Sequence, residues 1–359
     1  MGRNDEIPRF ANVLIARFSA LGDVAMTVPV IYSVCAAYPH VNFIMITQEV
    51  PASLFINAPS NLTVLGFDIK TRYHGVAGLW RLCRELRSKY HIDAFVDLHY
   101  VLRTHFISLF LRLAGIPCRH INKGRRGKRA LTRASNKRML PLISSRARYR
   151  EVFHRFGFSF DETFTSIFGD ERANPAAFAE ISAPKPAGER WIAVAPFAKH
   201  RGKIYPLPLM AKVVDAMAAW DNVRIFLFGA GEQERDILHP WAERHENVVS
   251  LAEKRYGFPV ELSLLSYCDV MLSMDSANMH LAALVKLTVV SVWGATHPYC
   301  GFMGWHQSER NAVQLNMTCR PCSVFGNKPC YRGDYYCLAG IPPSLMISKV
   351  KEVLDGKCE

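Results

Sequence analysis

The chain has 359 residues, of which half are hydrophobic, with ten cysteines and a formal net charge of +13. This length suits one large or two medium domains. The longest apolar run, 106–118, is interrupted by Arg112 and falls short of the roughly 18 residues of a membrane span. The first ten residues lack the apolar core of a signal peptide. We therefore expect a cytoplasmic protein whose cysteines are thiols.

In the first half of the chain, short β-rich apolar runs alternate with longer amphipathic stretches. The expected strands are 12–18, 42–47, 62–67 and 93–98, and the expected helices lie near 24–38, 75–90 and 103–114. Pro29 stands too deep in the first of these helical stretches for a first-turn proline, so we expect a kink or a later helix start there. The alternation predicts parallel strands joined by right-handed crossovers.

An Ala-, Pro- and Gly-rich stretch at 173–190 interrupts the alternation, which then restarts. It predicts a boundary between two domains, 1–178 and 179–359. The second half has expected strands at 191–196, 223–229, 248–252, 269–274 and 289–294, with helices near 207–219, 232–245 and 276–286. The predicted fold class is α/β, with two doubly wound domains and a ligand cleft between them at the C-terminal ends of the strands.

Most of the excess positive charge lies in one segment. Residues 119–150 contain twelve Lys or Arg and no acidic residue. Such a segment favours an anionic partner: nucleic acid, an acidic membrane surface or a multiply phosphorylated substrate. A solvated basic loop is the other interpretation.

A carboxylate follows the first expected strand in ARFSALGD, residues 16–23. Asp23 stands at the start of a helix with an apolar face, and taken alone this pattern favours a helix cap. The small residues before it, which include Ser19 and Gly22, would let a ligand approach the backbone closely.

A second carboxylate, Asp275, ends a strand in DVMLSMDSANMH, residues 269–280. Ser276 and His280 are four residues apart and share one helix face near its N-terminus. Free N–H groups beside a hydroxyl and an imidazole suit a diphosphate. In the alternative interpretation Asp275 is a cap and His280 a packed core residue.

Two loops of the second half carry further polar groups. Lys199, Arg201 and Lys203 lie after the strand 191–196 and suit phosphate neutralisation. In FGAGEQER, residues 228–235, Glu234 replaces the third glycine of a dinucleotide fingerprint. That signal is incomplete, and Glu232 is instead a candidate acceptor of ribose hydroxyls.

Four cysteines lie close together in the segment 319–337. Cys319, Cys322, Cys330 and Cys337 have the spacing C-x2-C-x7-C-x6-C. This spacing fits a structural zinc site, although no histidine reinforces it, and free or partly oxidised thiols are the alternative.

Six segments in register resemble glycosyltransferase family 9, the ADP-heptose:lipopolysaccharide heptosyltransferases. They are LIARFSALGDVAMTVPVI, DAFVDLHYVLRTHFISLFLRLAG, KIYP, LFGAGEQE, DSANMHLAAL and WGATHP. The resemblance implies a GT-B fold of two Rossmann-like domains, with the acceptor on the N-terminal side and the sugar nucleotide on the C-terminal side. It also implies inverting transfer of heptose from ADP-heptose to the lipid A-core oligosaccharide, with no bound metal and no cofactor.

By motif position, the resemblance implies that Asp23 is the general base. It places the donor at Lys203, Glu232, Asp275 and His280. We add Lys199, Ser276 and Ala277 to the donor site. We expect the anionic lipid A-core acceptor to be bound by Ser19, Gly22, Arg103, Arg119, Lys123, Arg125 and Arg126, with peripheral contact to the inner membrane and no nucleic acid.

Departures from the family pattern leave alternatives for the function. Ala277 replaces the usual glycine of the donor signature, and His297 with Pro298 replaces an acid-proline pair. A GT-B sugar-nucleotide epimerase would bind a similar donor without needing a basic acceptor face. A basic nucleic-acid-binding protein would explain the charge but not the donor motifs, and an inactive paralogue would keep the fold without the reaction.

Overall fold

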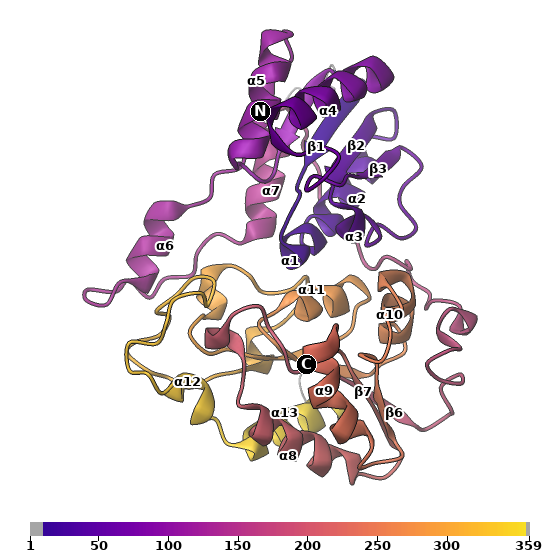
Figure 1. Cartoon of the computed structure of the whole chain (residues 1–359), viewed down its shortest axis with the longest axis vertical. Coiled ribbons are helices and arrows are strands. Elements are labelled where there is room, and N and C mark those ends of the chain that lie inside the picture. The colour runs from indigo at the N-terminus through magenta and orange to yellow at the C-terminus, as the bar shows by residue number, and fades with distance from the viewer. Residues whose placement is uncertain (1–9, 357–359) are drawn as a thin grey trace, which may run out of the picture. The chain divides into compact units, whose positions relative to one another are not determined.

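The computed structural model describes residues 10–356, so residues 1–9 and 357–359, which include Cys358, lie outside the described part. The chain forms two compact units (Figure 1). The first comprises the residues up to 123 together with 143–167, and the second comprises 124–142 and the residues from 168 onward.

The first unit is built on a five-stranded parallel sheet in the order β3-β2-β1-β4-β5. Its strands are β1 (Asn12–Ala16), β2 (Asn42–Thr47), β3 (Leu62–Gly66), β4 (Ala94–Asp97) and β5 (Cys118–His120). Nearly all residues of β1, β2 and β4 are buried, as expected for central strands that are covered on both faces.

The helices of this unit are α1 (Leu21–Ala25), α2 (Val28–Ala37), α3 (Glu49–Ala52), α4 (Gly75–Tyr90), α5 (Leu102–Leu113) and α7 (Ser145–His154). The expected later helix start is confirmed, because α1 ends before α2 and Pro29 lies in the first turn of α2. One core of the unit packs β1 and β2 against apolar residues of α4 and α5.

The second unit has a six-stranded parallel sheet in the order β11-β10-β9-β6-β7-β8. Its strands are β6 (Arg190–Ala195), β7 (Val223–Leu227), β8 (Val248–Ser250), β9 (Val270–Met274), β10 (Val289–Val292) and β11 (Ala312–Val313). The parallel strands predicted in both halves are therefore confirmed.

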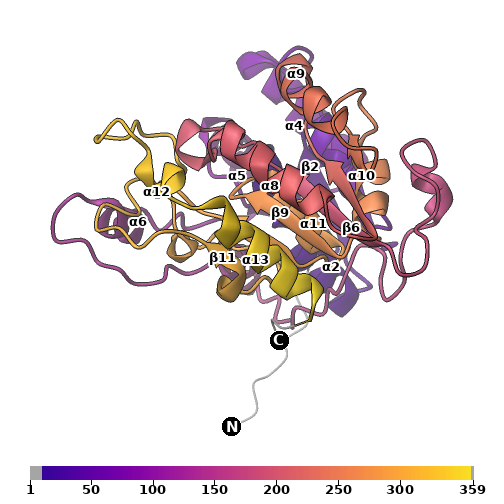
Figure 2. The same ribbon diagram turned by 90° about the horizontal axis from the view of Figure 1, so that it is seen from below.

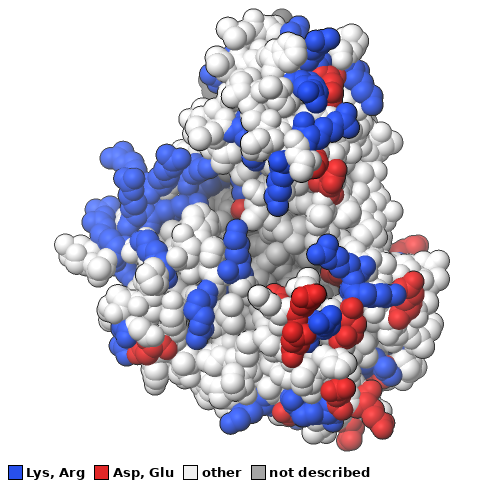
Figure 3. Space-filling view, viewed as in Figure 1, with Lys and Arg blue, Asp and Glu red and all other residues white. Residues whose placement is uncertain are grey.

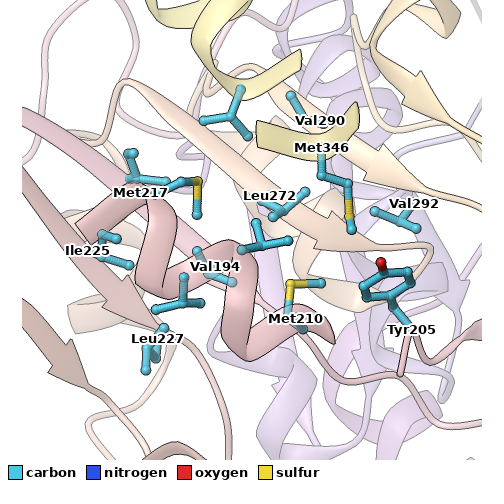
Figure 4. Close-up of a cluster of buried hydrophobic side chains, with 14 of the residues drawn as sticks. Val194, Tyr205, Met210, Met217, Ile225, Leu227, Leu272, Val290, Val292 and Met346 are labelled. Carbon is cyan, nitrogen blue, oxygen red and sulfur yellow. The ribbon is translucent and has the colours of Figure 1, made fainter. Parts of the chain in front are cut away.

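The helices of the second unit are α6 (Arg125–Thr132), α8 (Leu207–Ala218), α9 (Glu232–Ala242), α10 (Phe258–Leu265), α11 (Ala277–Leu284), α12 (Tyr336–Ala339) and α13 (Pro343–Leu354). Helices α8 and α13 lie side by side over the sheet (Figure 2). Met210 and Met217 of α8 and Met346 of α13 meet the strand residues Val194 and Leu272 in the main core (Figure 4).

Two stretches pack differently from the predicted domains. Residues 124–142 belong by their contacts to the second unit, and Leu142 donates its N–H to the carbonyl of Tyr299 over 2.9 Å. Phe178, at the predicted boundary, is fully buried and packs against Trp191 and Tyr267 with ring centroids 5.9 and 5.1 Å away. Within residues 10–356, no helix combines the length and apolarity needed to cross a membrane.

Candidate active site

In the first unit, the turn after β1 places a carboxylate on a short helix. Asp23 is the third residue of α1, and its Oδ2 accepts the N–H of Ala20, the N-cap residue, over 3.3 Å. The expectation that Asp23 itself caps the helix is wrong, because the helix begins two residues earlier. Asp23 instead accepts the backbone N–H of the N-cap residue, and its side chain is 25% exposed. Ser19 and Gly22 lie half-buried beside it.

A buried arginine holds this carboxylate. Arg17 follows β1 directly, and its Nη2 lies 2.5 Å from Asp23 Oδ2. Its Nη1 donates to the carbonyl of Leu98 over 2.7 Å, which ties it to the end of β4. Tyr149 of α7 lies under the guanidinium at 5.8 Å and donates its hydroxyl to the backbone oxygen of Asp23 over 3.4 Å. The Ala20 N–H and the Arg17 guanidinium therefore both hold the carboxylate at Oδ2, while Tyr149 holds the backbone of the same residue.

Neither Arg17 nor Tyr149 was identified from the sequence. The sequence signal for Arg17 was its position directly after an apolar strand, because a charge that is buried there must be paired. Tyr149 offered no such signal, since it comes from a helix more than a hundred residues later in the chain.

A neutral histidine lies next to this pair. His99 follows β4, and its Nδ1 accepts the N–H of Phe18 at 3.4 Å. Burial, together with the charges of Arg17 and Lys123, lowers the pKa of His99 to about 3. Arg103 also acts on this ring. The structure therefore brings two predicted acceptor residues, Lys123 and Arg103, into the neighbourhood of Asp23.

The other predicted acceptor residues lie on β5 and α6. Arg119 is an exposed residue of β5, and its guanidinium lies 5.5 Å from the ring of Phe156. Arg125 and Arg126 are the first two residues of α6, are exposed and belong to the second unit. A dense group of Lys and Arg side chains covers this helix (Figure 3).

In the second unit, the sheet order gathers the predicted donor residues. Strands β10, β9, β6 and β7 are neighbours in that order. Because parallel strands end at one edge of a sheet, the loops after them lie together. Of the predicted donor residues, Asp275 follows β9, Lys199 and Lys203 follow β6, and Glu232 begins the helix after β7. Thr296, which was not predicted, follows β10.

Lys203 and Asp275 form a buried ion pair. Lys203 Nζ lies 3.0 Å from Asp275 Oδ2, with the two side chains 16% and 3% exposed. The hydroxyl of Thr296 donates to the same oxygen over 2.8 Å. The lysine stem runs against Gly326, whose φ is +73° and where an added Cβ would meet Lys203 Cγ at 2.4 Å. A cation is thus held at the strand ends with part of its surface open.

The helix start beside this pair is capped by a hydroxyl. Ser276 is the N-cap of α11, and its Oγ accepts the N–H of Asn278 over 3.3 Å. The alternative in which Asp275 serves only as a cap is therefore wrong. Ser276 and Ala277 are half-buried, whereas His280 is 7% exposed in the second turn. The helix start is open to a ligand, and the imidazole packs behind it.

The remaining predicted donor residues are exposed. Lys199 lies on the loop after β6, and Glu232 is the first residue of α9. Glu234 folds back to accept the N–H of Ala230 over 2.8 Å, and burial raises the pKa of its carboxyl group. Glu234 thus closes the turn, whereas Glu232 is exposed to solvent.

The four cysteines of 319–337 line one small cavity of about 10 Å³ in the second unit. All are free thiols. Within residues 10–356, no three His, Cys, Asp or Glu side chains are arranged to hold a metal ion. Arg320, 3% exposed, fastens this segment to the loop after β10 by donating to the carbonyls of Gly294 and Thr296 over 2.5 and 2.9 Å. It thereby supports the loop whose Thr296 hydroxyl meets Asp275.

Known proteins share this architecture. The family model described as glycosyltransferase family 9 (heptosyltransferase) matches residues 79–329. A lipooligosaccharide heptosyltransferase 2 of Campylobacter jejuni (strain 81116) is 22% identical over 341 residues, which cover 93% of this chain and 96% of that protein. The protein of the same name from another C. jejuni strain is 26% identical over 136 residues, 37% of this chain and 41% of that protein.

Solved structures agree in fold. The glycosyl transferase of family 9 from Veillonella parvula matches with a TM-score of 0.73 at 15% identity, covering 96% of this chain and 98% of that one. The E. coli heptosyltransferase WaaC with ADP matches with a TM-score of 0.64 at 17% identity, covering 95% and 99%. The two sheets described above are those of a GT-B fold. Because the family model spans well over half of the sequence, this chain belongs to glycosyltransferase family 9.

Proposed function

We propose that this glycosyltransferase moves a heptose from ADP-heptose to the lipid A-core oligosaccharide in lipopolysaccharide core biosynthesis, with inversion. The observation that carries the proposal is the buried Lys203–Asp275 pair beside the open start of α11. A held cation next to a helix N-terminus suits the diphosphate of a sugar nucleotide. The names of the relatives, and the ADP in the WaaC structure, support the choice of nucleotide and sugar.

In this proposal the second unit binds the donor. Lys203, with Lys199, faces the diphosphate, and Ser276 and Ala277 offer the helix start to it. Glu232 accepts hydrogen bonds from the ribose hydroxyls, and His280 supports the helix start from behind. As the bond between the anomeric carbon and the diphosphate breaks, its electron pair leaves with the phosphate oxygen, and the positive charges stabilise that oxygen.

The first unit supplies the base. The acceptor hydroxyl attacks the anomeric carbon from the face opposite the leaving group, and Asp23 takes its proton. Arg17 holds the carboxylate by one oxygen, and the 25% exposure of the side chain leaves access to it. Ser19 and Gly22 flank the acceptor, while Arg103 and Lys123 face its anionic groups. We also assign Arg119, Arg125 and Arg126 to the phosphates of the lipid A core, at the cytoplasmic face of the inner membrane.

A donor screen tests the proposal. The purified chain is titrated with ADP-, UDP- and GDP-sugars by calorimetry, and then incubated with ADP-heptose and a heptose-free core acceptor. We expect preferential binding of ADP-heptose and a product with inverted anomeric configuration. A clear preference for a uridine donor would contradict the donor assignment, and turnover of the sugar nucleotide without acceptor would indicate an epimerase.

Removal of charge from α6 should weaken acceptor use. In the variant Arg125→Gln with Arg126→Gln, we expect kcat/KM for the acceptor to fall about tenfold or more, because two phosphate-facing charges are lost. Donor affinity should stay unchanged. The matched control is Arg255→Gln with Lys351→Gln, which removes two exposed charges elsewhere in the same unit. Equal acceptor kinetics in both double variants would reject the acceptor role of α6.

A further inference from the structure

Helix α5 is apolar on two opposite faces. Its inner face packs Ile107 and Leu111 into the core of the first unit. A second stripe, Leu102, Phe106, Leu109 and Leu113, follows at i, i+4, i+7 and i+11 on the other side. Leu102, Leu109 and Leu113 are 87%, 59% and 82% exposed. A helix on the surface of a water-soluble unit normally presents polar residues on that side.

Helix α4, which packs against α5, extends this apolar surface. Val76 and Trp80 are 68% and 48% exposed. Between the two helices lies an open groove of about 610 Å³, lined by Val76 and Leu79 of α4 and by Leu102 and Phe106 of α5. The exposed side chains of both helices therefore form one continuous apolar surface, which we call the α4–α5 face. Large exposed apolar surfaces of this kind mark binding sites.

The two helices that form the α4–α5 face are strongly basic. The two helices carry one acidic residue, Glu85, against six basic ones: Arg81, Arg84, Arg87, Lys89, Arg103 and Arg112. Arg84 and Arg87 continue the edge of α4 that begins with Val76 and Trp80, and the Arg84 guanidinium lies 5.4 Å from the Trp80 ring. Lys and Arg side chains, with fewer Asp and Glu, are spread over this part of the first unit (Figure 3).

We propose that the α4–α5 face docks the first unit onto an anionic lipid bilayer, with α5 lying in the plane of the interface. Apolar side chains together with basic ones are the combination that binds the boundary between headgroups and acyl chains. A second copy of the chain fits this face poorly, since a two-fold interface would bring the basic side chains of α4 and α5 from both copies together. The inference deepens the proposed function, because it assigns the surface that brings the enzyme to a lipid-borne acceptor.

The test measures vesicle binding by the purified full chain without donor or acceptor. Vesicles of phosphatidylcholine alone are compared with vesicles containing about one-third phosphatidylglycerol, in a flotation assay. We expect binding to the anionic vesicles that weakens with added salt. Leu102→Glu with Leu113→Glu should lower the partition coefficient at least about tenfold, because two charges enter the apolar stripe. Arg84→Glu with Arg87→Glu should lower it on anionic vesicles alone.

The matched control is Val50→Glu with Leu345→Glu, two exposed apolar positions outside the face that are 67% and 40% exposed. It should bind as the unmodified chain does. The proposal is overturned if the unmodified chain does not bind vesicles, or if the Leu102/Leu113 variant binds them as well as the unmodified chain. It is also overturned if vesicle binding is lost only in the Arg125/Arg126 variant. If the unmodified chain forms dimers and the Leu102/Leu113 variant is monomeric, the α4–α5 face is a dimer interface instead. Transfer to a soluble, lipid-free acceptor tests the catalytic proposal separately, and this double variant should leave it unchanged.

Discussion

Replacement of Asp23 by asparagine should lower the rate of sugar transfer by about 10²–10⁴-fold, the usual contribution of a general base. An amide oxygen still accepts the N–H of Ala20, so the turn that positions the side chain is expected to persist. The amide cannot take a proton from the acceptor hydroxyl. Because the residue lies in the first unit and the donor residues lie in the second, donor affinity should change by less than about twofold.

The measurement pairs initial rates under saturating substrates with calorimetric titration of ADP. Asp68→Asn is the matched control, since Asp68 also accepts backbone N–H groups in a turn of the same unit, those of Lys70 and Thr71. Its transfer rate should equal that of the unmodified chain. If Asp23→Asn keeps more than about a third of the activity, Asp23 is not the base.

Replacement of Lys203 by methionine should lower kcat/KM for the donor by about 10²–10³-fold. Loss of one preorganised group that stabilises developing charge has an effect of this size. The variant should also be less stable, by up to about 3 kcal/mol, because Asp275 is 3% exposed and keeps only the Thr296 hydroxyl as a described side-chain partner. Steady-state kinetics and urea unfolding of the same preparation separate the two effects.

The chain contains a well-matched control for this variant. Lys185 pairs with Asp269 over 2.6 Å, with side chains 12% and 19% exposed. Asp269 precedes β9 and Asp275 follows it, so the two pairs stand at opposite ends of one strand. Lys185→Met should be destabilised to a similar degree while kcat/KM of the folded enzyme stays the same. A similar fall of kcat/KM in both variants would mean that stability, rather than phosphate contact, explains the Lys203 result.

Elements with strong local patterns were predictable. The central strands β1, β2, β6 and β9 are continuous apolar runs, and the helices between them have a clear apolar face, so parallel sheets followed. Weak patterns were missed. Strand β11 has two residues, α13 begins with Pro343 directly after Pro342, and α6 lies in a run of arginines that looked like a loop. In α6 tertiary packing decides the conformation, because Leu131 is 0% exposed and Lys128 lies 5.2 Å from the rings of Phe302 and Phe325 in the second unit.

The sequence by itself determined where the polar groups of the site occur along the chain. Asp23 and Asp275 each follow a predicted strand, and their positions can be read from the apolar runs that precede them. Only the tertiary structure decided what these carboxylates contact, namely Arg17 for the first, and Lys203 and Thr296 for the second. The reason is physical: sheet order sets which strand ends are neighbours, and the order of the strands in space differs from their order in the chain.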